Sequence, residues 1–126
     1  RSLSRFHDNR IEPVLRAYFG QVTLARRDAS LIKNNTTLLQ KRFDQLAKMI
    51  NPRPFLIGDS LSLADCGFVP SFAILKRLQP ILGFSIDLDE SLRAYETALA
   101  NHPSVTEELR GYYKALDDWV AATLNI

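Results

Sequence analysis

The sequence has few of the residues that cross-link a fold or carry out catalysis. Its single cysteine, Cys66, excludes a disulfide within the chain, and nothing requires an oxidising compartment. The histidines, His7 and His102, stand far apart without a His-Glu-x-x-His pattern or a cysteine pair, so we expect no metal site. The five glycines form neither a dinucleotide-binding fingerprint nor a phosphate-binding loop, and there is no Gly-x-Ser-x-Gly turn. The common nucleotide-binding, zinc and serine-hydrolase signatures are therefore excluded.

Long apolar runs and a strong excess of one charge are also missing. No apolar segment approaches the ~20 residues of a membrane span, and the first residues lack the apolar core of a signal peptide. The formal net charge is +2, and the basic cluster of Arg26, Arg27 and Lys33 is interrupted by Asp28. Such a cluster is too weak for a nucleic-acid surface. We therefore expect a cytoplasmic protein whose partners include neither a membrane nor a nucleic acid.

Helical periodicity runs through most of the chain, with apolar residues recurring at spacings of three and four. Strand patterns are almost absent. Pro13 falls inside the first predicted helix and should bend it, because proline removes one hydrogen bond of the helix. The sequence therefore predicts a single all-α domain over residues 1–126, with five or six helices. These predicted helices cover residues 3–29, 32–50, 63–78, 88–100 and 108–126.

The most informative stretch precedes the predicted central helix. Ser62 is a favourable N-cap, and Asp65 stands three residues later, where its carboxylate can reach back to the backbone N–H of the cap. A general-base role for Asp65 is the alternative, but its position favours the structural role. Cys66 is either a reactive thiol or a packed, inert side chain. Because the helix is apolar on every side, we expect the thiol to be buried and inert.

This stretch carries a family resemblance. The segment FLIGDSLSLADCGFVPSFAIL, residues 55–75, resembles the part of the glutathione transferases that enters their central buried helix. The opening helix around residues 5–16 and the turn at residues 102–105 are also similar to that family's C-terminal domain. Overall, the sequence resembles the bacterial members of the family. The resemblance thus covers the whole chain and implies the helical bundle of the glutathione transferase C-terminal domain. The signature positions that match are Gly58, Asp59, Ser62, Ala64 and Asp65.

The resemblance implies a two-domain enzyme that joins glutathione to hydrophobic electrophiles. An N-terminal thioredoxin-like domain, absent from this chain, would bind most of the glutathione and carry the catalytic residue. We therefore expect no catalytic residue here and no activity from this chain alone. The helical domain would supply one wall of the substrate pocket and much of a homodimer interface.

The resemblance also suggests binding residues. Asp8 aligns with a polar position that reaches across the dimer to the γ-glutamyl end of glutathione, and the alternative is a solvated surface residue. Glu12, Leu15 and Arg16 resemble the stretch that faces the second substrate, and Ile74 a pocket-wall position. An ordinary helix face or core position remains the alternative for these four.

A non-catalytic function is the competing hypothesis. Related helical domains serve as protein–protein docking modules, and fold alone does not fix function. The two hypotheses differ in whether the intact protein binds glutathione.

Overall fold

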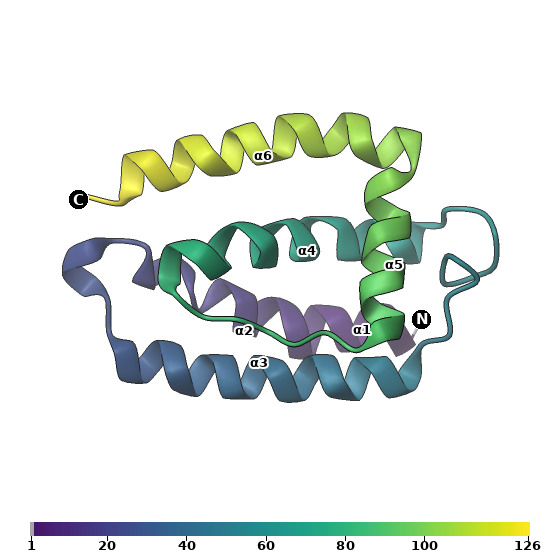
Figure 1. Cartoon of the computed structure of the whole chain (residues 1–126), viewed down its shortest axis with the longest axis horizontal. Helices are drawn as coiled ribbons and strands as arrows, with labels where there is room; N and C mark the ends of the chain where they lie inside the picture. The colour runs from purple at the N-terminus through teal and green to yellow at the C-terminus, as the bar shows by residue number, and fades with distance from the viewer. Residues whose placement is uncertain (1) are drawn as a thin grey trace.

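The computed structural model describes residues 2–126, and its regular elements are all helical, so the predicted all-α class is confirmed. Figure 1 shows α3, α4 and α6 running side by side, with the short helices α1 and α2 beside α4 and with α5 crossing one end of the bundle. A single isolated bridge in the described chain, between Phe55 and Gly58, closes the loop before α4. The helix bounds are α1 Ser2–Phe6, α2 Glu12–Arg16, α3 Ala29–Met49, α4 Leu63–Leu82, α5 Glu90–Asn101 and α6 Pro103–Thr123.

The first predicted helix, over residues 3–29, is wrong as a continuous element. The chain forms α1, then a π-helical turn at His7–Ile11 (η1), then α2, and continues in short 3₁₀ turns at Phe19–Gln21 and Leu24–Arg26. Pro13 lies in the first turn of α2. Because proline has no N–H and its ring clashes with the preceding turn, the regular ladder stops before it and a wider turn takes its place.

The second predicted helix is confirmed as α3. Asp28 caps it by accepting hydrogen bonds from the N–H groups of Ser30 (2.9 Å) and Leu31 (3.2 Å). Its apolar stripe faces the core, as the spacing of three and four requires. The buried members of this stripe are Ile32, Leu39, Phe43 and Leu46.

Helix α4 lies at the centre of the bundle, between α6 and α3 in Figure 1. Most of its middle is buried, but in its first turn only Asp65 is fully buried, because Leu63 is 91% exposed and Cys66 is also exposed. The expectation of a helix covered on every side is therefore wrong at its N-terminal end. The buried residues of α4 are Asp65, Phe68, Val69, Ser71, Phe72, Ala73, Leu75, Leu78 and Leu82.

Asp65 organises the start of α4, as predicted. It has no exposed surface, and its carboxylate accepts hydrogen bonds from the Ser62 N–H (2.9 Å) and the Ser62 hydroxyl (2.8 Å). It also accepts from the N–H of Leu56 (3.0 Å) and the hydroxyl of Tyr95 on α5 (2.7 Å). One carboxylate thus ties the preceding loop, the helix N-terminus and α5 together. This arrangement confirms the capping role of Ser62 and Asp65.

The Asp65–Tyr95 bond predicts a loss of stability at alkaline pH. Burial, followed by the hydrogen bond to Asp65, raises the pKa of Tyr95 far above its ordinary value of 10.0. Because the pKa of Tyr95 is higher in the folded than in the unfolded state, its contribution to stability is fully present below the unfolded-state pKa. This contribution declines as the pH rises above that value. The free energy of unfolding should therefore fall between about pH 10 and 11, by at most ~1.4 kcal/mol per pH unit for one tyrosine.

Urea unfolding followed by circular dichroism across this pH range measures the effect. Tyr95→Phe, which cannot ionise, should be less stable at neutral pH and should show a shallower alkaline slope. An equal slope in both proteins would exclude Tyr95 as the source.

Candidate functional site

The residues predicted to contact substrates from the first helix occupy two faces. Asp8 lies in the π-helical turn η1, with its side chain 68% exposed. Glu12 and Arg16 form a partly exposed ion pair on α2, with a closest N–O distance of 3.4 Å. Leu15, in contrast, has no exposed surface and belongs to the core. It can support a binding wall from beneath, and a direct contact with a ligand stays an untested prediction.

Asp8 is held from behind by a buried pair of polar side chains. His7 is 3% exposed and Ser71 on α4 is 4% exposed, and the His7 Nε2 atom lies 2.6 Å from the Ser71 hydroxyl. The His7 Nδ1 atom lies 2.9 Å from the Asp8 carboxylate. Because a carboxylate can only accept, Nδ1 donates to Asp8, and Nε2 of a neutral ring accepts from Ser71. The ring also packs on Phe68, with centroids 4.7 Å apart.

The hydrogen-bonded chain from Ser71 through His7 to Asp8 has the order of a serine-hydrolase catalytic triad, but it cannot act as one. Ser71 lies inside α4 and is almost completely buried, so no substrate carbonyl can approach its hydroxyl. A nucleophile must be accessible as well as activated. The three residues therefore make a structural chain that fixes the position of Asp8.

A groove of about 590 Å³ lies between α4 and α6. Its volume falls within the roughly 300–1,000 Å³ of small-molecule sites. Tyr112 on α6 borders it, and burial, followed by the nearby charge of Glu12, raises the pKa of this tyrosine. Glu12 on α2 therefore lies near the α6 wall. The residues that line the groove are Cys66, Val69, Pro70, Glu108, Leu109, Gly111 and Tyr112.

Cys66 corrects the sequence-based expectation of a buried thiol. Its side chain is exposed and lines the groove. Val69 and Pro70, one turn further along α4, line the same groove, and periodicity does not reveal that α6 leaves this side of the helix open. Ile74, predicted as a wall position, is half-buried against the core about one turn beyond Pro70 and does not line the groove. Its contact with a ligand stays a prediction.

Three residues of this region were not predicted from the sequence: His7, Ser71 and Tyr112. His7 and Ser71 are 64 positions apart, so no local spacing connects them. Two signals were present, a histidine inside an apolar pattern and a serine on the apolar side of the central helix. Neither identifies its partner without the fold.

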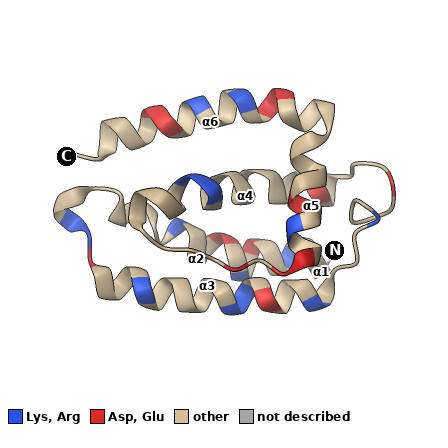
Figure 2. Ribbon diagram, viewed as in Figure 1, with Lys and Arg blue, Asp and Glu red and all other residues tan. Residues whose placement is uncertain are grey.

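Metal clusters, membrane-spanning helices and continuous basic stripes are three further features that indicate a ligand or partner. Within residues 2–126, no three His, Cys, Asp or Glu side chains lie close enough together to hold a metal ion. No helix in this part of the chain has the length and hydropathy to cross a membrane. Figure 2 shows Lys and Arg interspersed with Asp and Glu along α3 and α6, so neither helix presents a continuous basic stripe.

A comparison with known protein families shows to which family the chain belongs. The family model described as "Glutathione S-transferase, C-terminal domain" matches residues 6–103. The chain belongs to this family. The match covers the glutathione S-transferase C-terminal helices from the end of α1 to the first residue of α6, and it contains Asp8, Cys66 and the Ser62–Asp65 cap. Searches of curated proteins and of solved structures found no match.

Proposed function

We propose that this chain is the helical substrate-pocket and dimerisation domain of a protein that transfers glutathione to hydrophobic electrophiles. The α4–α6 groove is the observation that carries the proposal. Its walls include Val69, Pro70, Leu109 and Tyr112, an apolar surface on which an electrophile with an aromatic or aliphatic body can pack. Glu12 on α2 lies close enough to Tyr112 on this wall for its charge to raise the pKa of the tyrosine.

Glutathione would approach from the side of Asp8. A carboxylate is the natural partner of the γ-glutamyl ammonium group, and an oriented charge gives a stronger and more specific contact than a free one. Asp8 is both exposed to a ligand and held by His7. The catalytic residue and most glutathione contacts would belong to a thioredoxin-like domain. Such a domain would also cover Leu63 and Ile57, strongly exposed apolar side chains close to the start of α4.

The dimer proposal rests on the outward side of α3. Leu31 and Leu38, one heptad apart, are both exposed there. Leucines at this spacing lie on one face of a helix and can pack against a second copy. The dimer would bring Asp8 of one subunit towards the glutathione of the other.

A groove-filling substitution tests the proposal. In the full-length gene product, Cys66→Trp should raise the KM for a bulky aryl halide electrophile by about tenfold, the effect of losing roughly 1.4 kcal/mol of apolar binding energy. The matched control is Ala115→Trp, at an exposed position of α6 that does not line the groove. Steady-state glutathione conjugation gives KM and kcat for both proteins.

Two results would contradict the enzyme proposal. Absence of conjugation together with failure to bind immobilised glutathione would favour the non-catalytic docking module. Equal effects of both tryptophans would show that the electrophile does not use this groove.

A further inference from the structure

The α4–α6 groove carries charged side chains of one sign. Glu108 on α6 is exposed and lines the groove, and none of the described residues that line it is a lysine, an arginine or a histidine. Within residues 2–126, Glu108 takes part in no ion pair, whereas its neighbour Glu107 pairs with Arg110 at 3.8 Å. The Glu108 carboxylate is therefore available to a ligand in the groove.

The α4 wall of the groove adds a backbone acceptor. Pro70 lies inside α4 and lines the groove together with Cys66, one turn before it. In a regular helix the carbonyl of Cys66 accepts from the N–H of residue 70, but proline has no N–H. The main-chain oxygen of Cys66 thus lacks its usual donor on the side of α4 that faces the groove. A carbonyl in this state favours a ligand that brings an N–H group.

A second carboxylate lies near the α6 wall. Burial, followed by the charge of Glu12, raises the pKa of Tyr112, so the tyrosine keeps its proton at neutral pH while Glu12 adds negative charge beside it. The ion pair between Glu12 and Arg16, with a closest N–O distance of 3.4 Å, offsets part of this charge. A tyrosine ring is also a surface on which an aryl group or a cation can pack.

We propose that the electrophiles bound in this groove carry a protonated amino group on an apolar body, and that Glu108 selects for this charge. The inference rests on the proposed function of the groove as the electrophile site. The body packs on Val69 and Leu109, the ammonium group pairs with Glu108, and the carbonyl of Cys66 is a further acceptor on the opposite wall. An anionic substrate of the same shape brings a second negative charge to Glu108 and no donor for the carbonyl.

The amino group takes no part in the bonds that change. With an aryl chloride, the glutathione thiolate forms the new C–S bond at the carbon that carries the chlorine. Chloride then leaves with the electron pair of the C–Cl bond. The charge of the amine therefore affects binding and orientation of the substrate, and its effect belongs in KM more than in kcat.

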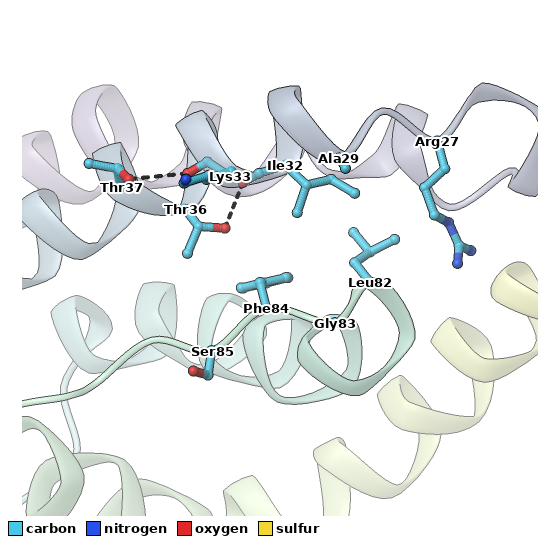
Figure 3. A pocket seen from close by; sticks show the side chains of 10 residues that line it. All are labelled: Arg27, Ala29, Ile32, Lys33, Thr36, Thr37, Leu82, Gly83, Phe84 and Ser85. Atoms are coloured by element: carbon cyan, nitrogen blue, oxygen red, sulfur yellow. Dashed lines mark hydrogen bonds between the residues drawn. The ribbon is translucent and has the colours of Figure 1, made fainter.

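A second cavity, of about 530 Å³, lacks such acceptors. Figure 3 shows it between the first turns of α3 and the end of α4, with Arg27 and Lys33 at opposite ends. Among the described residues that line it there is no aspartate or glutamate. From Pro70 in the groove to Leu82 in this cavity, α4 advances by roughly 18 Å at its usual rise per residue. The two sites are therefore separate, and an apolar amine should bind in the α4–α6 groove.

Calorimetric titration of the full-length gene product without glutathione tests the charge preference apart from catalysis. The probes are 4-phenylbutylamine, 4-phenylbutanol and 4-phenylbutanoate, which share one apolar body and differ in charge. The amine should bind about threefold more tightly than the alcohol, the gain expected of one solvent-exposed ion pair. Glu108→Lys should weaken amine binding on the order of tenfold and strengthen butanoate binding, because an attraction becomes a repulsion, and added salt should reduce both effects.

Glu107→Lys is the matched control, since Glu107 is the neighbouring exposed residue of α6 and does not line the groove. It should leave the affinity for the amine almost unchanged. Cys66→Trp, which fills the groove, should weaken binding of the amine. Circular dichroism should show the same helix content in every variant.

Equal affinities for the amine and the alcohol overturn the inference, as do equal effects of Glu108→Lys and Glu107→Lys. Amine binding that Cys66→Trp leaves unchanged also overturns it, because the amine then lies outside the groove. Failure of the proposed function looks different, since the amine then binds as predicted to a protein that conjugates no electrophile. If a chloronitrobenzene with an aminomethyl group is conjugated with the same KM by the parent and by Glu108→Lys, the enzyme function stands and the inference about charge is overturned.

Discussion

Replacement of Asp65 by alanine is expected to destabilise the domain by about 3–4 kcal/mol, a large part of the stability of a domain of this size. The carboxylate is completely buried and accepts four hydrogen bonds. Losing a cap alone costs about 1 kcal/mol. Here the backbone N–H of Leu56 and the hydroxyl of Tyr95 also lose their acceptor in a place that water cannot easily reach, and each such group adds roughly 1–3 kcal/mol before relaxation.

Urea unfolding at neutral pH, followed by circular dichroism, measures this loss. Asp65→Asn should fall between the parent and the alanine variant, because an amide keeps one accepting oxygen but points N–H groups at the other donors. Asp59→Ala, at an exposed aspartate of the preceding loop, is the control and should change stability little. A loss of less than about 1 kcal/mol for Asp65→Ala would mean that only the local cap matters and that the bond to α5 contributes nothing.

The part of this network that sequence could predict is the part that is local. Ser62 and Asp65 are three positions apart, so the geometry of a helix N-terminus is enough to connect them. Tyr95 stands 30 positions from Asp65, and only the packing of α5 against α4 brings it there. Its place in the apolar pattern of the predicted helix over residues 88–100 indicates a buried face, yet the direction of its hydroxyl depends on the fold.

The candidate site was predictable to a smaller degree for the same reason. Apolar periodicity identifies the stripe of a helix but not which neighbour covers it, and Cys66 is exposed because α6 leaves a groove on its side of α4. Pro13 indicated that the first predicted helix would be irregular, but it did not indicate that the irregularity would be a π-helical turn. A π-helical turn places His7 inwards while Asp8 points outwards, and a single bent helix over residues 3–29 does not predict this pair.

Removing the hydroxyl of Ser71 is expected to show how this pair works. Ser71→Ala leaves the Nε2 atom of His7 without a partner in the core and should destabilise the domain by about 1–3 kcal/mol. His7→Phe keeps a ring against Phe68 and should cost less, because the freed serine hydroxyl can turn to the carbonyl four residues before it in α4. The double variant should be more stable than the sum of the single losses implies, with a coupling of about 1 kcal/mol or more.

Urea unfolding of the four proteins gives this coupling, and Ser60→Ala, at an exposed loop serine, controls for the loss of a hydroxyl. Additive losses would show that the 2.6 Å contact contributes no net stability.

The glutathione affinity of the full-length variants then separates an effect on stability from an effect on binding. Asp8→Asn should weaken glutathione binding while leaving stability almost unchanged, because its side chain is 68% exposed. Ser71→Ala should weaken both, because a histidine that has lost its anchor on α4 no longer holds the Asp8 carboxylate in one orientation.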